Sequence, residues 1–186
     1  MTYAKRKIYL SSAPFSRGEN SLTDTPKRLE FTEKKKENII TAIYLGSILI
    51  ILAIIYTAQL PNSLWNEIFN FFTSLTLSPV GGGIALPAPA DLTAHRQLYN
   101  AGFQFAIGIG IVEIVILALR IFLNSPAARK AETVENIVFW LGSGYLIVTY
   151  LVNITIAAEW FVFWAGIIVV FGLGFVTRAV ILMVSR

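Results

Sequence analysis

The sequence predicts an all-α integral membrane protein with four transmembrane helices, arranged as two hairpins, and one external interfacial helix. Its composition is typical of a membrane protein, because 55% of the 186 residues are apolar and only 14% are charged. In addition, four apolar stretches are each long enough to cross a hydrocarbon core of about 30 Å at about 1.5 Å per helical residue. We therefore divide the chain into a basic cytoplasmic N-terminal segment, residues 1–38, and a four-helix transmembrane domain, residues 39–186.

The four predicted spans are separated by segments that contain charges, prolines or glycines. Pro61 ends the first span, and Asp91 or Thr93 is expected to cap the helix that carries the second. A short polar connection, residues 127–136, leads to the third span. The turn at Glu159 is flanked by aromatic residues, which are typical of the edge of the hydrocarbon. The predicted spans are residues 39–59, 99–122, 137–156 and 161–184.

Residues 62–77 predict a helix that lies in the membrane interface. Trp65, Phe69 and Phe72 recur at helical spacing, and asparagines and a glutamate occupy other parts of the helical wheel. A re-entrant segment is the alternative, but these polar residues favour the interfacial helix. Glycine and proline in residues 78–91 exclude a continuous helix, so this segment should lie outside the membrane or be covered. Within it, the glycine run at residues 81–83 predicts a flexible turn.

Lysine and arginine fall almost entirely on one side of the predicted spans. Nine precede the first span, three lie at the second-to-third connection and two at the C-terminal end, whereas Arg96 alone lies between the first and second spans. By the positive-inside rule, both termini are cytoplasmic and the loop of residues 60–98 is external. The sequence thus predicts a multi-pass protein of the cell membrane. The triplet Lys34, Lys35 and Lys36 is expected to contact anionic lipid headgroups.

The most unusual residue is Glu113, a carboxylate near the middle of the predicted second span. A charge at the bilayer centre costs roughly 2.5–3.5 kcal/mol even on lenient insertion scales, so Glu113 should face protein or water and have a partner. It follows a ladder of small residues on one helical face, Gly102, Ala106 and Gly110. Such a ladder lets another helix approach closely.

Arg178 is the predicted partner of Glu113. It follows a second ladder, Gly166 and Gly174, and counting residues from the start of each span places the two charges about 4–5 Å apart in depth. The ladders also predict that the second and fourth spans pack closely. In one alternative, Arg178 reaches the headgroups, while Glu113 is protonated and bonded to a neighbouring polar side chain. In another, Glu113 meets a second subunit or a bound ion.

The composition excludes several kinds of site. The chain has no cysteine, which excludes disulfides, thiolate metal sites and iron–sulfur clusters, and one histidine cannot form a bis-histidine haem site. His95 is expected to be solvated, and a metal site or pH sensor formed with Asp91 is the weaker alternative. The glycine run at residues 81–83 is not followed by the lysine of a phosphate loop. We therefore predict no cofactor, no metal and no nucleic-acid partner.

Two short sequences recur in the two predicted helical hairpins. The sequence Glu-Asn-Ile begins at both Glu37 and Glu135, and Leu-Gly-Ser follows at residues 45–47 and 141–143. A duplicated hairpin would explain this recurrence. Chance is the alternative, because apolar helices often share such sequences.

Two classes of function fit these features. The first is a small integral subunit or scaffold of a larger membrane complex, which packs through its glycine-rich helix faces. The alternative is an oligomeric proton or cation channel or transporter that uses Glu113. The expected partners are the lipid bilayer and either other membrane-protein subunits or further copies of this chain. An enzyme is not predicted, because the sequence suggests neither a serine–histidine pairing nor a carboxylate cluster.

Overall fold

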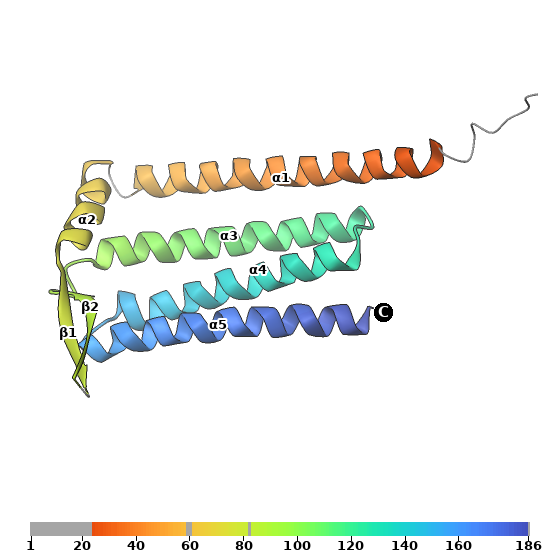
Figure 1. Ribbon diagram of the computed structural model, residues 1–186. Coiled ribbons are helices and arrows are strands. Elements are labelled where there is room, and N and C mark those ends of the chain that lie inside the picture. Colours follow the sequence, from red (N-terminus) through yellow and green to blue (C-terminus); the bar gives the residue numbers. More distant parts are fainter. Residues whose placement is uncertain (1–23, 59–60, 82, 186) are drawn as a thin grey trace, which may run out of the picture. The chain divides into compact units, whose positions relative to one another are not determined.

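The computed structural model describes residues 24–58, 61–81 and 83–185. The chain divides into two compact units, residues 1–35 and residues 36–186. The first helix belongs to both units. The elements in chain order are α1 (Asp24–Ala58), α2 (Pro61–Thr73), β1 (Leu75–Gly81), β2 (Ile84–Pro89), α3 (Arg96–Phe122), α4 (Ala127–Leu146), the π-helical η1 (Ile147–Val152) and α5 (Ala157–Val184) (Figure 1).

Four helices in the described residues are long and apolar enough to cross a membrane, as the sequence predicts. They are Lys35–Ala58, Arg96–Phe122, Ala127–Val152 and Ala157–Val184. Helix α4 packs against both α3 and α5, and the three helices run side by side with alternating direction (Figure 1). We call the end that carries β1 and β2 the hairpin end, and the end at the α3–α4 turn, residues 123–126, the turn end.

Helix α4 begins earlier than the sequence predicted. Residues 127–136, predicted as a polar connection, form its first turns. Asn124 has a φ of 51°, which ends α3 in the left-handed region that asparagine tolerates. Ala131 and Thr133 are almost fully buried. The prediction was wrong because the polar residues of this segment form the side of a helix that packs on α3, which hydropathy alone does not reveal.

Residues 78–91, which were predicted to form no continuous helix and to contain a flexible turn at residues 81–83, form most of a β-hairpin, so the fold is not purely helical. Strands β1 and β2 pair antiparallel, from Leu75 opposite Pro89 to the turn. An isolated two-stranded hairpin is marginal in water. This one is held by α5, because the Trp160 indole donates a hydrogen bond to the carbonyl of Pro87 at 3.1 Å. Ala88 also joins the buried cluster at the hairpin end.

That buried cluster is the main apolar core of the hairpin end. It joins the hairpin to α3, to the end of α4 and to the start of α5. Its members are Ala88, Tyr99, Leu146, Leu151, Ile154, Trp160 and Phe163, and Phe71 of α2 packs against them. Phe71 makes edge contacts with the rings of His95 and Tyr99. Helix α2 is thereby fixed to the bundle on one face.

Carboxylates organise the chain just before α3 and at the start of α5. Asp91 accepts hydrogen bonds from the backbone of Thr93 and Ala94 and from the Thr93 hydroxyl. The Thr93 hydroxyl and the two backbone N–H groups hold the pKa of Asp91 below its usual range. Glu159 accepts from the backbone N–H groups of Thr155 and Ile156, which caps α5. The cap residue of α3 itself is His95.

The link between Trp160 and Pro87 gives a test of how the hairpin is held. Trp160→Phe keeps an aromatic ring but removes the donor, so the hairpin should loosen by about 0.5–1.5 kcal/mol, the net value of one hydrogen bond. We expect a lower Tm in detergent and faster protease cleavage between Leu75 and Pro89. Trp164→Phe, which changes a half-exposed ring nearby, is the control. Equal effects of the two changes would contradict this account.

Candidate functional site

Glu113 lies on the buried face of α3 and bonds to α4. Its side chain accepts a hydrogen bond from the Asn136 amide at 2.9 Å, and only 3% of the residue is exposed. Asn136 lies in the segment predicted as a polar connection. Its helical spacing from Thr133 was the signal that could have placed both side chains on one face towards α3.

Arg120, two helical turns after Glu113, joins three elements near the turn end. Its guanidinium donates to the carboxylate of Glu37 on α1 at 3.3 Å and to the Thr133 hydroxyl at 2.7 Å. It also donates to the backbone carbonyl of Arg129. Arg120 is 9% exposed. A buried cation of this kind needs several acceptors, and α1 and α4 supply them.

The structure does not bring Glu113 and Arg178 together. Arg178 donates to Glu135 of α4 at 3.1 Å. The predicted pair must therefore be corrected. The predicted pair came from comparing the depths of the two charges in α3 and α5. Helix α4 packs on both of these helices, and its adjacent residues Asn136 and Glu135 face α3 and α5, respectively. Each charge thus meets a nearer partner.

The two predicted glycine ladders lie against α4 and η1, and the predicted close packing of the second and fourth spans is replaced by packing of each span on α4. A Cβ at Gly102 would be 3.9 Å from Ile147, and one at Gly110 would overlap Leu141. On α5, a Cβ at Gly166 would be 2.9 Å from Leu146, and one at Gly174 would be 3.3 Å from Glu135. Ala106, between the two glycines of α3, is 2% exposed.

A cavity of about 160 Å³ lies between α1, α3 and α4 beside Glu113. We call it the Glu113 cavity. Its lining combines charged, hydroxyl and amide groups with only two aliphatic side chains. The lining residues are Ile40, Thr41, Tyr44, Glu113, Ile116, Arg120, Glu132, Thr133 and Asn136.

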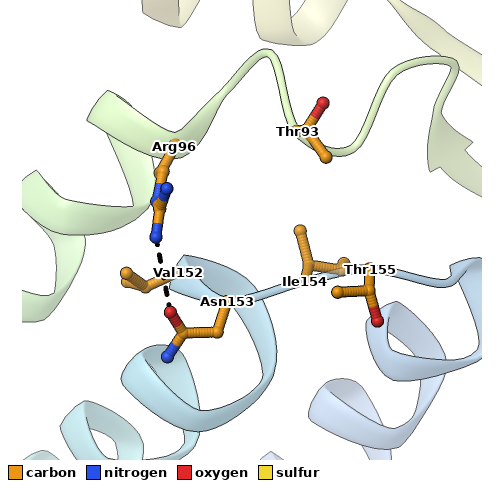
Figure 2. A pocket seen from close by; sticks show the side chains of 6 residues that line it. All are labelled: Thr93, Arg96, Val152, Asn153, Ile154 and Thr155. Carbon is orange, nitrogen blue, oxygen red and sulfur yellow. Dashed lines mark hydrogen bonds between the residues drawn. The ribbon is translucent and has the colours of Figure 1, made fainter.

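A second cavity, of about 260 Å³, lies at the hairpin end (Figure 2). Arg96 donates to the side chain of Asn153 at 3.4 Å across one side of it. The hydroxyls of Thr93 and Thr155 bond to Asp91 and Glu159, and both point away from the space between them (Figure 2). With its polar groups engaged and two carboxylates close by, this cavity is the poorer candidate for a binding site.

His95 is buried rather than solvated, which corrects the prediction. Its Nε2 lies 2.9 Å from the Ser74 hydroxyl, and its Nδ1 lies 3.5 Å from the Glu67 carboxylate. The sequence analysis did not predict this serine–histidine pairing, because the β-hairpin separates Ser74 from His95 by 21 residues in the chain. Neither cavity described above includes Ser74 or His95. These contacts therefore connect α2 and the residue after it to the N-cap of α3.

Two further predictions concern the triplet Lys34, Lys35 and Lys36 and metal binding. Lys36 donates to the carbonyl of Leu123 at 3.4 Å, which ties α1 to the turn end. Lys35 is exposed, and the side chain of Lys34 lies outside the described residues. Within the described part of the chain, no group of three histidine, cysteine, aspartate or glutamate residues is placed to hold a metal ion.

The corrected pairing of Arg178 can be measured by double-mutant cycles. Glu135→Gln and Arg178→Gln should be non-additive in unfolding free energy, as contacting residues usually are by about 0.5–3 kcal/mol. The low end is expected here because the Arg178 side chain is 43% exposed. Glu113→Gln and Arg178→Gln should be additive within about 0.5 kcal/mol. Reversible unfolding in mixed detergent gives both cycles. Coupling in the second cycle and not in the first would restore the original pairing.

No family model, curated protein or solved structure matches this chain.

Proposed function

We propose that this protein is a small integral subunit of a larger membrane complex, which packs two of its helices against transmembrane helices of a partner protein. The observation that carries the proposal is a contrast among its helical glycines. A Cβ added at any of seven of them would lie within 4 Å of another side chain. At Gly46 of α1 and Gly172 of α5 it would meet nothing within 4 Å.

Glycine without a packing role is unfavourable in a helix. It costs about 0.5–1 kcal/mol relative to alanine, and in membrane proteins small residues are enriched where helices approach closely. Ala42 and Ala53 share the exposed face of Gly46, and Ala165 shares that of Gly172. These two faces are suited to helices from another chain. Acyl chains alone would not require a small residue at either place.

The membrane position proposed for α2 follows from its helical wheel. Phe71 and Glu67 face the bundle. About two fifths of a turn round the wheel, Trp65, Phe69 and Phe72 are 66–71% exposed, and the exposed Asn66 and Asn70 follow them. A helix beside the end of the bundle would then place its aromatic arc in the headgroups and its asparagines in water.

The proposed location of this chain is the plasma membrane. In the proposed orientation, the turn end and both termini lie in the cytoplasm. It is supported by the basic residues near the turn end, where Lys36, Arg120, Arg129 and Lys130 lie. The sequence between the first and second candidate spans, residues 59–95, has no lysine or arginine, and Arg96 is the first residue of the second span.

Cysteine labelling tests this orientation in a chain that has no natural cysteine. An impermeant maleimide added to intact cells should label a cysteine at Ala90, which is exposed at the hairpin end, and should not label one at Ala128, which is exposed at the turn end. Permeabilised cells should label both, which checks reactivity. The reverse pattern in intact cells would show the opposite orientation.

Two substitutions test the proposed partner surfaces. Gly46→Leu and Gly172→Leu should leave the isolated chain folded, because both positions are open, but should block a partner helix. Co-purification in mild detergent should therefore lose a stoichiometric partner that the wild-type chain retains. Leu45→Phe and Leu173→Phe enlarge side chains that are 59% and 53% exposed, about a quarter of a turn away, and should retain it.

Each outcome of this experiment decides something. Retention of the partner by both glycine variants would refute the proposed surfaces. A wild-type assembly that contains only this chain would refute a hetero-complex and indicate a homo-oligomer. Circular dichroism and native mass of each variant show that loss of the partner does not come from unfolding.

A further inference from the structure

We propose that the Glu113 cavity contains water and that Glu113 is a proton-binding site supplied from the turn end. The proposal is independent of the partner surfaces described above. The ligand is a proton carried by water, so the step is transfer from hydronium to the carboxylate, which gives a carboxylic acid and a water molecule.

The cavity is suited to water by both size and chemistry. A water molecule needs about 10–15 Å³ of cavity volume and two to four polar partners. At about 160 Å³ the cavity has room for several molecules. The hydroxyls of Thr41 and Tyr44, the Asn136 amide and the charged groups provide partners. A dry cavity with this lining would leave those groups without solvent.

Arg120 gives a second and independent indication. Its terminal nitrogens have acceptors, but its buried Nε has no hydrogen-bond partner. A buried donor without a partner costs about 1–3 kcal/mol, and more when it is charged. Because Arg120 lines the cavity, a water molecule there can accept this hydrogen bond.

Glu113 can bind the same water. It accepts one hydrogen bond, from Asn136, and a carboxylate has about four acceptor positions. The charged and titratable side chains near Glu113 are Arg120 on its own helix, Glu132 on α4 and Tyr44 on α1. Glu37 of α1 forms an ion pair with Arg120. Protonation relieves repulsion by Glu132 and removes a charge from the interior of the membrane.

The polar lining of the Glu113 cavity lies between Glu113 and the turn end. Arg120 lies two residues before the end of α3, and Glu132 lies in the second turn of α4, so the cavity continues from Glu113 towards that end. On the other side of Glu113, Leu141 packs on Gly110 and Ile51 packs near Gly108. Ile109 between them is fully buried. These apolar contacts lie on the side of Glu113 that faces the hairpin end, so the proposal places the supply of water at the turn end.

Infrared difference spectroscopy of the full chain in lipid nanodiscs tests the site. Lowering the pH should produce the C=O band of a protonated carboxyl group. The band should shift in D₂O and should be absent in Glu113→Gln, a variant of the same shape. Glu113→Asp should keep a band at a changed position, which separates loss of the carboxyl group from misfolding. A wild-type band that persists in Glu113→Gln, or no Glu113 band at any pH, would overturn the proposal.

The role of the cavity is tested by the rate of deuterium exchange at the Glu113 carboxyl group. Thr41→Leu fills the cavity with an apolar side chain and should slow this exchange severalfold. Thr57→Leu is the matched control, because Thr57 also lies on α1 and bonds to the carbonyl four residues earlier, as Thr41 does, but does not line the cavity. Equal rates in the two variants would show that the cavity does not supply Glu113.

Discussion

The close fit of α3 and α5 on either side of α4 determines where the polar groups of this protein lie. The fit is reciprocal on both sides. Towards α3, Leu141 packs on Gly110 while Ile107 packs near Gly144. Towards α5, Leu146 packs on Gly166 in the same manner. Large side chains opposite glycines bring helix backbones close together, which favours dispersion contacts where no hydrophobic effect drives association.

This arrangement explains how charged residues are accommodated. Thr133 and Asn136 face α3, where they meet Arg120 and Glu113, and Glu135 faces α5, where it meets Arg178. The glutamate of each recurring Glu-Asn-Ile sequence forms an ion pair with an arginine. Glu37 of the first candidate span binds Arg120 of the second, and Glu135 of the third binds Arg178 of the fourth. Both helical hairpins thus contain a carboxylate–arginine pair near the turn end.

The sequence was sufficient for features that depend on composition and periodicity, and insufficient for those that depend on which elements are neighbours. Long apolar runs predicted four helices able to cross a membrane. The partner of Arg178 was wrong because depth along a helix does not say which helix lies beside it. His95 was expected in water because its partners, Glu67 of α2 and Ser74 just after α2, lie more than 20 residues away in the sequence. The hairpin was missed because its prolines and glycines resemble those of a loop, and because the Trp160 hydrogen bond and the buried Ala88 that help to hold it are long-range contacts.

The proposed partner surface and the Glu113 cavity share helix α1. Ile40, Thr41 and Tyr44 form one wall of the cavity, and Gly46 lies two residues after Tyr44. Helix α1 is the least constrained wall, because only 11% of its most apolar segment is buried. A partner helix at Gly46 would restrict its movement and so change the hydration of the cavity. By linkage, the protonation state of Glu113 would then alter partner affinity by the same factor that the partner alters proton affinity.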